Sequence, residues 1–369
     1  MSEKSCLTDE TFHKELAVCL SSWYNTCSRD LPWRKSHDPY CILVSEAMLQ
    51  QTQVERVKFF YNRWLEKLPD FSTLADADES EVISLWQGLG YYTRARNLQK
   101  TAEFLRAAGL ETLPPDPEFL KKLPGVGPYT VGAVSSIAFN LPVPAVDGNV
   151  RRVFSRLLNL ETDPAKKPGA VLIENHVRAV LNLGEPRILT QAFMELGATV
   201  CLPGTSCRCS ECPVRHICAA FRSGTQQQRP VSTRKTAVCR REGAALLIGS
   251  PENGYLFKIR PALGLWAGFY EIPWKIAEEG HNAADALAGL VSELGVSGHC
   301  RDLKIEETLK FTRWQVKVHL WELRTLPAMA GNDGVLKSEE EVQELPMPAG
   351  LKRLVSRALE KKQLELFDS

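Results

Sequence analysis

Features of membrane and secreted proteins are missing from this sequence. No apolar run approaches the roughly 20 residues that span a bilayer. The first residues, MSEKSCLTDETFHKE, are polar and acidic, so we expect neither a signal peptide nor an Arg-rich transit peptide. The net charge is only +1 and the pI is about 7.5. Overall charge therefore does not predict nucleic-acid binding, and any such binding must come from local patches.

What is present is typical of a soluble globular protein. The 369 residues are 44% hydrophobic and 24% charged, enough for two or three domains. There are 11 cysteines, an odd number, and five of them fall within residues 201–218. This clustering indicates a metal or cluster site in a reducing compartment rather than a disulfide framework.

The segment Leu123-Pro124-Gly125-Val126-Gly127-Pro128 predicts a tight turn that leads into a helix. Gly125 and Gly127 permit a backbone hairpin with positive φ, and Pro128 suits a first helical position. The apolar, small residues that follow are typical of a buried helix. Free N–H groups at such a turn favour a phosphate ligand.

A second turn follows at 141–148 and ends in Asp147-Gly148. Asp147 is placed to cap a helix that begins near Asn149 and carries several arginines. A capping role alone is the simpler interpretation, and a catalytic carboxylate is the alternative.

Glu46 lies within YCILVSEAMLQQ (40–51), a short and very apolar predicted helix. A carboxylate on an apolar face is costly when ionised, so we expect a raised pKa and a catalytic task. The alternative is that Glu46 pairs with a nearby arginine such as Arg34. A new helix is expected after it, opened by a capping box of Thr52 and Glu55.

Two helices within 80–108 are joined by GLGYYTRARN, which places Tyr91 and Arg94 after a glycine-containing turn. Aromatic rings can wedge into or stack on bases while arginines contact phosphate. Ordinary core and solvated surface is the competing interpretation.

The cysteine-rich segment has the spacing Cys209-x2-Cys212-x5-Cys218, with Cys201 upstream. Four thiolates so close in sequence are typical ligands of an iron–sulfur cluster or of zinc, and spacing alone does not decide between them. No strand pattern appears before residue 219, so this part is predicted to be all-α.

The polar stretch 222–235 is predicted to be a linker, after which the chain changes character. AALLIGS, YLFKIRP, GFYEIPW and WQVKVHLWEL are β-rich, and DALAGLVSELGV has helical periodicity. A second domain, of mixed α and β structure, is therefore expected.

Taken together, these motifs resemble the helix-hairpin-helix DNA glycosylase superfamily, and within it the adenine DNA glycosylases of the MutY type. The resemblance covers residues from about 12 to about 355. The segments that carry it are PWR (32–34), SEAMLQQTQV (45–54), GLGYYTRARNL (88–98), LPGVGPYT (123–130), VDGNVRRV (146–153), the cysteine loop and GLWAGFYEIP (264–273).

The resemblance implies a mainly α glycosylase domain followed by an α+β Nudix-like domain. The helical domain would span 1–221 and comprise a six-helix barrel, a helix-hairpin-helix at about 120–140, and a cluster loop at 201–218. The linker would span 222–235, the Nudix-like lesion-recognition domain 236–360, and a tail 361–369.

It also implies an activity, the excision of adenine mispaired with 8-oxoguanine or guanine in double-stranded DNA. Glu46 would be the general acid at adenine N7 and Asp147 the carboxylate facing the sugar, supported by Tyr129 and Asn149. These roles agree with the chemistry of glycosidic bond cleavage. The leaving base needs an acid and the oxocarbenium-like sugar needs a negative charge, so two carboxyl groups in different environments are required. Glu46 is expected to stay protonated and Asp147, at a helix N-terminus, to stay ionised.

DNA contacts are implied for a larger set: Arg34, Gln51, Thr52, Leu89, Tyr91, Arg94, Gly125, Gly127, Phe311, Thr312 and Arg313. Gln51 and Tyr91 would wedge into the duplex. The relatives that also cleave the strand carry a lysine where this chain has Tyr129. We therefore expect a monofunctional enzyme. A bifunctional lyase and an inactive DNA-binding adapter are the alternative functions.

Three features depart from the family pattern. The spacing from Cys201 to Cys209 is C-x7-C, and Cys207 intrudes, so either Cys201 or Cys207 could be the first ligand. We expect a [4Fe–4S] cluster on Cys201, Cys209, Cys212 and Cys218. The usual Phe-Ser-His of the lesion loop reads Phe311-Thr312-Arg313. A hydrolytic Nudix box carries several glutamates at set positions to bind Mg²⁺. In residues 286–296 only Glu293 occupies such a position, so nucleotide hydrolysis is not expected.

The segment Gln363-Leu364-Glu365-Leu366-Phe367 resembles the peptide by which bacterial repair proteins bind the sliding clamp. It predicts the clamp as a partner, with Leu366 and Phe367 as anchors. We further expect a monomer of the bacterial cytoplasm, associated with the nucleoid.

Overall fold

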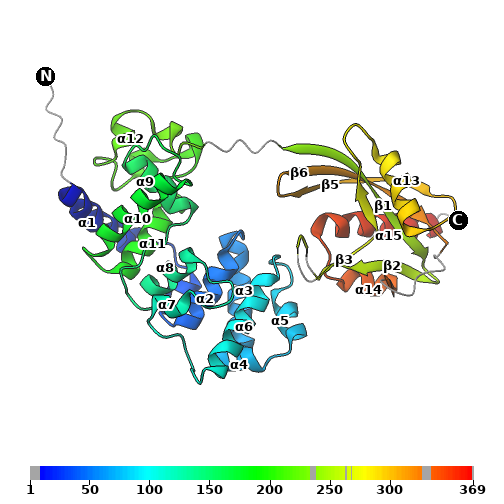
Figure 1. The fold of residues 1–369 in the computed structure, drawn as a ribbon, viewed down its shortest axis with the longest axis horizontal. Coiled ribbons are helices and arrows are strands. Elements are labelled where there is room, and N and C mark those ends of the chain that lie inside the picture. Colours follow the sequence, from blue (N-terminus) through cyan, green and yellow to red (C-terminus); the bar gives the residue numbers. More distant parts are fainter. Residues whose placement is uncertain (1–8, 233–237, 262–263, 267, 326–333, 368–369) are drawn as a thin grey trace. The chain divides into compact units, whose positions relative to one another are not determined.

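A computed structural model describes residues 9–232, 238–261, 264–266, 268–325 and 334–367, with side chains to 362. The chain divides into two compact units, Met1–Arg234 and Lys235–Ser369. Figure 1 shows that helices form the first unit, whereas strands and helices are combined in the second. The predicted change from α to mixed structure is confirmed.

The first unit contains no strand in its described residues, 9–232. Its elements are α1 (Asp9–Cys27), η1 (Pro32–Arg34), α2 (Pro39–Leu49), α3 (Val54–Lys67), α4 (Phe71–Asp76), α5 (Glu79–Trp86), α6 (Thr93–Ala107), α7 (Pro117–Leu120), α8 (Pro128–Ile137), α9 (Gly148–Leu157), α10 (Lys167–Leu181), α11 (Pro186–Thr199), η2 (Gly204–Ser206), η3 (Cys209–Glu211), α12 (Ala219–Arg222) and η4 (Gln226–Gln228).

Local chemistry explains where the helices near the site begin. Proline occupies the first position of α2 and of α8, where its missing N–H costs no hydrogen bond. Asp38 caps α2 through the N–H groups of Tyr40 and Cys41. The predicted capping box at Thr52 is wrong, because α3 begins after Gln53, which makes no side-chain capping bond, and Thr52 Oγ1 donates to the Gln50 carbonyl.

Helices α1, α9, α10 and α11 share one hydrophobic core in which Leu16, Phe154 and Phe193 are fully buried. Three cysteines of the 201–218 loop, Cys201, Cys212 and Cys218, pack against this core. The cysteine loop is therefore attached to the same packed body that carries helix α9.

In its described residues, the second unit is built on a seven-stranded mixed sheet. Its elements are β1 (Cys239–Ser250), β2 (Gly254–Ile259), β3 (Tyr270–Glu271), β4 (Trp274–Ile276), α13 (Ala283–Leu294), β5 (Arg301–Phe311), β6 (Trp314–Leu323), β7 (Gly334–Lys337), α14 (Glu339–Glu344) and α15 (Ala349–Phe367).

The strand order is β3-β2-β1-β6-β5, with β4 paired to β1 and β7 to β2. β1 runs parallel to β6, while β5 and β6 form an antiparallel hairpin. Alternate residues of β1 enter different cores: Ala245 and Leu247 pack with α15, whereas Leu246 and Ile248 pack with α13. The two helices therefore cover opposite faces of the sheet.

Two details differ from the sequence-based picture. The predicted linker 222–235 begins too early, because η4 and Arg229 belong to the helical unit and Arg229 is buried. Arg156 Nε donates to the Gln226 carbonyl at 2.8 Å and so holds this segment. Strand β5 was not predicted, since its sequence RDLKIEETLKF is rich in charge.

Among the described residues, no helix is both long and apolar enough to cross a membrane.

Candidate active site

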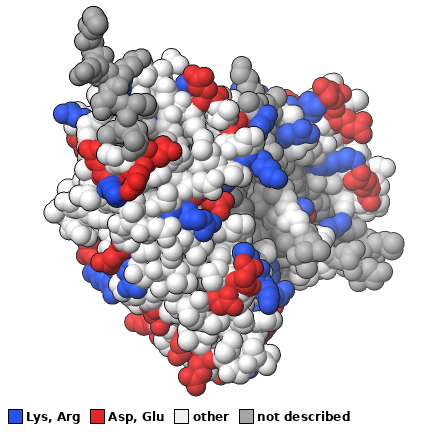
Figure 2. Space-filling model, turned by 60° about the vertical axis from the view of Figure 1, so that its left-hand side comes forward, with Lys and Arg blue, Asp and Glu red and all other residues white. Residues whose placement is uncertain are grey.

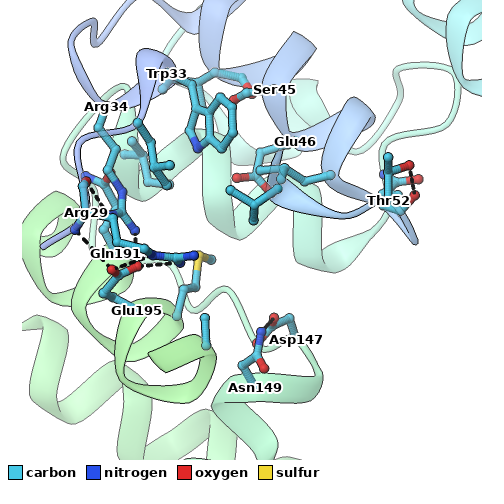
Figure 3. A pocket seen from close by; sticks show the side chains of 18 of the residues that line it. Arg29, Trp33, Arg34, Ser45, Glu46, Thr52, Asp147, Asn149, Gln191 and Glu195 are labelled. Atoms are coloured by element: carbon cyan, nitrogen blue, oxygen red, sulfur yellow. Dashed lines mark hydrogen bonds and ion pairs between the residues drawn. The ribbon is translucent and has the colours of Figure 1, made fainter. Parts of the chain in front are cut away.

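A pocket of about 500 Å³ lies in the helical unit, a volume typical of small-molecule sites. It brings together segments far apart in the sequence, from α2, α8, α11 and the start of α9. Figure 3 shows Glu46 entering from one side, Asp147 and Asn149 from another, and Arg29, Arg34 and Glu195 grouped together. All four predicted catalytic residues line this pocket: Glu46, Tyr129, Asp147 and Asn149.

Glu46 is buried on α2 and accepts a hydrogen bond from a tyrosine of α8. The Tyr129 hydroxyl donates to Glu46 Oε2 at 2.7 Å. Burial raises the pKa of Glu46 from 4.5 to about 7. The Tyr129 bond lowers this pKa, and the nearby Asp147 carboxylate raises it. The expectation of a raised pKa is therefore confirmed, and the carboxyl group can hold a proton near neutral pH.

Asp147 both caps a helix and lines the pocket, so the two interpretations of this residue are compatible. Its Oδ1 accepts from the Val150 N–H at 2.7 Å, and its Oδ2 accepts from Asn149 Nδ2 at 2.9 Å. Burial raises the pKa of Asp147, opposed by these hydrogen bonds and by the charge of Arg152. The helix dipole, from which an ionised Asp147 is expected, does not account for this effect of burial.

Asn149 is itself fixed by Arg152, whose Nη2 donates to Asn149 Oδ1 at 2.8 Å. Arg152 Nε donates to the carbonyl of Cys201 at 2.7 Å. One guanidinium thus connects the Asp147–Asn149 pair to the cysteine loop.

Arg34 does not pair with Glu46, which removes the alternative explanation for that carboxyl group. Arg34 and Arg29 both bind Glu195, with Nη2–Oε2 distances of 2.7 Å each. Burial alone would raise the pKa of Glu195, but these bonds outweigh it and hold the pKa at about 2. The pocket therefore holds an Arg29–Glu195–Arg34 ion-paired triad beside Glu46, whose pKa is raised.

The turns that precede α3 and α6 carry the two predicted wedge residues. Gln51 and Tyr91 both have left-handed backbone, with φ of 58° and 50°, and the Tyr91 side chain is 61% exposed. Thr52 lines the pocket and is half-buried, whereas Leu89 is buried.

The prediction that Arg94 contacts a DNA phosphate is wrong. The residue is only 9% exposed, and its guanidinium binds main-chain carbonyls, among them those of Gln50 and Gly90. The glycine hairpin agrees better with its prediction: Gly125 and Gly127 are exposed, and Gly125 has φ of +73°. A side chain at Gly125 would also collide with Asn97 at 2.4 Å.

In the second unit, Phe311 ends strand β5, and Thr312 and Arg313 form the turn to β6. Thr312 has φ of 47°, and the exposed Arg313 stacks over the Trp314 ring at 5.6 Å. Phe311 packs against Trp266, with ring centroids 5.1 Å apart. The turn thus exposes the Thr312 hydroxyl and the Arg313 guanidinium next to the aromatic side chains of Phe311 and Trp314.

The cysteine loop forms a second cavity, lined by Cys201, Cys209, Cys212 and Cys218 but not by Cys207. Arg156 Nη1 lies 3.2 Å from Cys201 Sγ. Among the described residues, no three histidine, cysteine, aspartate or glutamate side chains converge closely enough to hold one metal ion. The four cysteines nevertheless line one common cavity.

Several pocket residues were not predicted: Arg29, Trp33, Gln191, Met194 and Glu195. Trp33 lies within the PWR motif at 32–34. Gln191, Met194 and Glu195 lie on helix α11, for which the sequence had predicted no function. A buried glutamate inside an otherwise apolar helix was the available signal for Glu195, the same signal that had identified Glu46.

Charge over the molecular surface is mixed. On the face shown in Figure 2, described basic and acidic side chains are interspersed and form no large area of one sign. This agrees with the small net charge of the chain.

Comparison with known families gives two matches. Residues 44–177 match the HhH-GPD superfamily of base excision DNA repair proteins, and residues 244–357 match the NUDIX domain. These matches agree with the division into a helical unit and a unit with a mixed sheet.

Curated relatives named adenine DNA glycosylase match more than half of the chain. The protein of Schizosaccharomyces pombe is 34% identical over 313 residues, which is 69% of this chain and 68% of the relative. That of Mycolicibacterium smegmatis is 40% identical, covering 58% of this chain and 73% of the relative. The mouse protein is 43% identical, and the match spans 41% of its length.

Among solved structures, a thermostable thymine-DNA glycosylase has a TM-score of 0.53 and 26% identity, covering 57% of this chain and 97% of that chain. Endonuclease III trapped in a covalent intermediate with DNA has a TM-score of 0.50 and 25% identity, covering 59% and 99%.

Proposed function

Since the chain belongs to the adenine DNA glycosylase family, we propose that it excises adenine opposite 8-oxoguanine or guanine by hydrolysing the N-glycosidic bond. The observation that carries this proposal is a pair of carboxyl groups, Glu46 and Asp147, in one pocket with unlike hydrogen-bonding environments. An adenine inside a duplex cannot reach such a pocket. The base must therefore be flipped out of the stack first.

Glu46 is the general acid in this proposal. A pKa of about 7 keeps a large share of the group protonated at neutral pH. The proton passes to adenine N7 as the bond between C1′ and N9 breaks. Water then adds to C1′ and returns a proton to the carboxylate, so Glu46 is regenerated.

Asp147 is the anion that faces the developing positive charge on the sugar. Its charge is supported by the Val150 N–H and by Asn149, and it raises the pKa of Glu46. Ionised Asp147 therefore favours a protonated Glu46, as two carboxyl groups with different tasks require.

Specificity for adenine is supported by the polar groups around the base pocket. Gln191 is buried, and its amide can both donate and accept, which matches the alternating donors and acceptors of an adenine edge. The Arg29–Glu195–Arg34 triad supplies further fixed groups, and Trp33 gives an aromatic wall. A pyrimidine would leave part of this set unpaired.

DNA contacts follow from exposed groups of both units. The N–H groups of the Gly125–Gly127 hairpin suit a phosphate, and Gln51 and Tyr91 are exposed residues suited to enter the stack. Thr312 and Arg313 offer hydrogen-bond donors to an oxidised base, with Phe311 beneath them. Single residues replaced at this turn should therefore alter the preference for 8-oxoguanine over guanine.

A [4Fe–4S] cluster on Cys201, Cys209, Cys212 and Cys218 is the proposed cofactor. The four thiols line one cavity, with Cys207 outside it, and Arg156 gives Cys201 a positive neighbour. One zinc ion, with Zn–S of about 2.3 Å, would need all four sulfurs to converge. Four cysteine thiolates that line one cavity are also the ligand set of a [4Fe–4S] cluster. When bound, the cluster would cross-link the loop to the core.

The activity is tested with duplexes carrying adenine opposite 8-oxoguanine, opposite guanine, or opposite thymine. Strand breaks that appear only after alkali support a monofunctional glycosylase. Breaks without alkali would favour a bifunctional lyase, for which a lysine in place of Tyr129 would be expected. No breaks in either condition would favour a DNA-binding adapter.

We also propose the bacterial sliding clamp as a partner and the bacterial cytoplasm as the site of action. The segment Gln363–Phe367 carries the clamp-like pattern; helix α15 continues to Phe367, and the side chains beyond 362 lie outside the described residues. Clamp binding would be compared for the full chain, for a chain ending at Lys362, and for the double variant Leu366→Ala, Phe367→Ala. Equal affinity of all three would contradict this part of the proposal.

A further inference from the structure

Arg94 joins two separate turns through its side chain. On one side it binds the segment that ends α2, on the other the segment that precedes α6. The Nη1 atom donates to the carbonyls of Ala47, Met48 and Gln50 at 2.7, 3.0 and 2.6 Å, and the Nη2 atom donates to Leu89 O, Gly90 O and Thr52 Oγ1 at 3.1, 2.8 and 3.3 Å.

Within the part of the chain that the structure describes, no carboxylate forms an ion pair with this buried cation. The main charge effect on its pKa, beside burial, comes from Tyr91, and burial lowers the pKa of Arg94 to about 10. Its partners are carbonyl dipoles instead, including those at the C-terminal end of α2, where a helix favours positive charge. The guanidinium plane also lies against the rings of Trp86 and Tyr91, at 5.3 and 5.5 Å.

The two turns held in this way are those that carry Gln51 and Tyr91. Both residues have left-handed backbone, which is unfavourable for residues other than glycine, and both are exposed. Such a conformation persists only when the surroundings impose it. Arg94 binds the carbonyls of Gln50 and Gly90, the residues immediately before each of them.

We propose that Arg94 is a positioning residue that locks these two turns into one rigid unit, so that Gln51 and Tyr91 enter the DNA stack together. This inference rests on the proposed function, because it assumes that adenine is flipped from a duplex. A lysine cannot replace the arginine, since a single ammonium with three donors cannot reach both groups of carbonyls. Base extrusion should therefore depend on Arg94 although the residue is itself too buried to grip DNA.

The test compares Arg94→Lys and Arg94→Ala with Arg106→Met, a control on the same helix whose arginine is exposed and paired with Asp76. The substrate carries 2-aminopurine next to the target adenine, so that fluorescence rises when the stack opens. For Arg94→Lys, we expect unstacking and single-turnover excision to fall about 100-fold, as for other displaced catalytic geometry. Affinity for undamaged duplex should stay close to wild type, whereas the melting temperature should fall by a few degrees, because buried carbonyls lose their donor. The control should match wild type throughout.

Hydrogen exchange of the free protein gives an independent readout. The amides of Thr52 and Leu89 close the two turns by bonding to Leu49 and Trp86 carbonyls. In Arg94→Lys both amides should exchange at least 10-fold faster, while the amide of Val131 in α8 should not change. Unstacking within threefold of wild type, or loosening of only one turn, would overturn the inference. If wild-type protein excises no adenine, the proposed function fails, whereas the exchange experiment still tests the lock.

Discussion

Tyr129 donates its hydroxyl hydrogen to Oε2 of Glu46, and this 2.7 Å bond connects the helix after the glycine hairpin to the apolar helix α2. The same bond opposes the rise in the pKa of Glu46, because a donor stabilises the ionised carboxylate more than the neutral acid. Two segments more than eighty residues apart therefore meet at the group proposed to protonate the leaving base.

Replacing Glu46 by glutamine should abolish excision and spare binding. The amide has nearly the same shape but no proton to transfer, so we expect a loss of at least about 10³-fold, near the upper range for general acids. Single-turnover excision and duplex affinity measured side by side are the check. Turnover within tenfold of wild type would exclude Glu46 as the acid.

The same variant should be more stable than wild type at pH 8. The pKa of Glu46 rises from 4.5 to about 7 on folding, so the folded state binds the proton more tightly than the unfolded state. Stability from this group is therefore lost as pH rises between these values, on the order of 3 kcal/mol. Urea unfolding at pH 5 and pH 8 should show the advantage of Glu46→Gln only at the higher pH.

Excision by the wild-type protein should decline as pH rises through about 7, where the acid loses its proton. Tyr129→Phe removes the bond that favours the ionised form, so the pKa of Glu46 should rise and the declining limb should move to higher pH. Rates measured between pH 5.5 and 9 with chemistry limiting would test this. A limb that moves to lower pH would mean that the hydroxyl does not donate to Glu46.

The ligand question at Cys201 and Cys207 is open to a direct comparison. Cys207→Ser should retain wild-type iron content and the brown absorption near about 400 nm that is typical of such clusters. Cys201→Ser and Cys212→Ser should lose both, because these side chains line the cavity. Iron loss on replacing Cys207, or a colourless wild-type protein with one zinc, would contradict the assignment.

In the second unit, Lys362 should be essential for stability. It forms an ion pair with the buried Glu322 and donates to the Tyr255 hydroxyl at 3.2 Å. Lys362→Ala would leave the buried Glu322 with only its longer ion pair to Arg324, Nε–Oε1 3.7 Å, at a cost of about 3 kcal/mol. The neighbouring Lys361, whose ammonium binds only the Leu303 carbonyl, provides the control, and its alanine variant should lose about 1 kcal/mol. Chemical unfolding of the wild-type protein and the two variants, followed through the transition of the second unit, gives these free energies of unfolding.

The sequence predicted the residues whose local pattern is unusual. Glu46 stands out because a carboxylate on an apolar helix is costly, and the Gly125 turn because only glycine suits its backbone and its contact with Asn97. The phosphate contact predicted for Arg94 was wrong, and the alternative pairing of Arg34 with Glu46 does not occur, because a sequence does not show which arginine is buried or which carboxylate it binds. Glu195, Arg29 and Gln191 were missed, because their pocket forms only when α11 packs beside α2 and α8. Strand β5 was missed because its exposed face is charged.

The most direct test of the account is identification of the released base. Wild-type protein is incubated with a duplex containing one adenine opposite 8-oxoguanine, and the small-molecule fraction is analysed by mass spectrometry. The account predicts one equivalent of free adenine per duplex and a target strand that remains unbroken until alkali is added, with no adenine released by Glu46→Gln. Absence of free adenine from the wild-type reaction, or equal release by the variant, would contradict it.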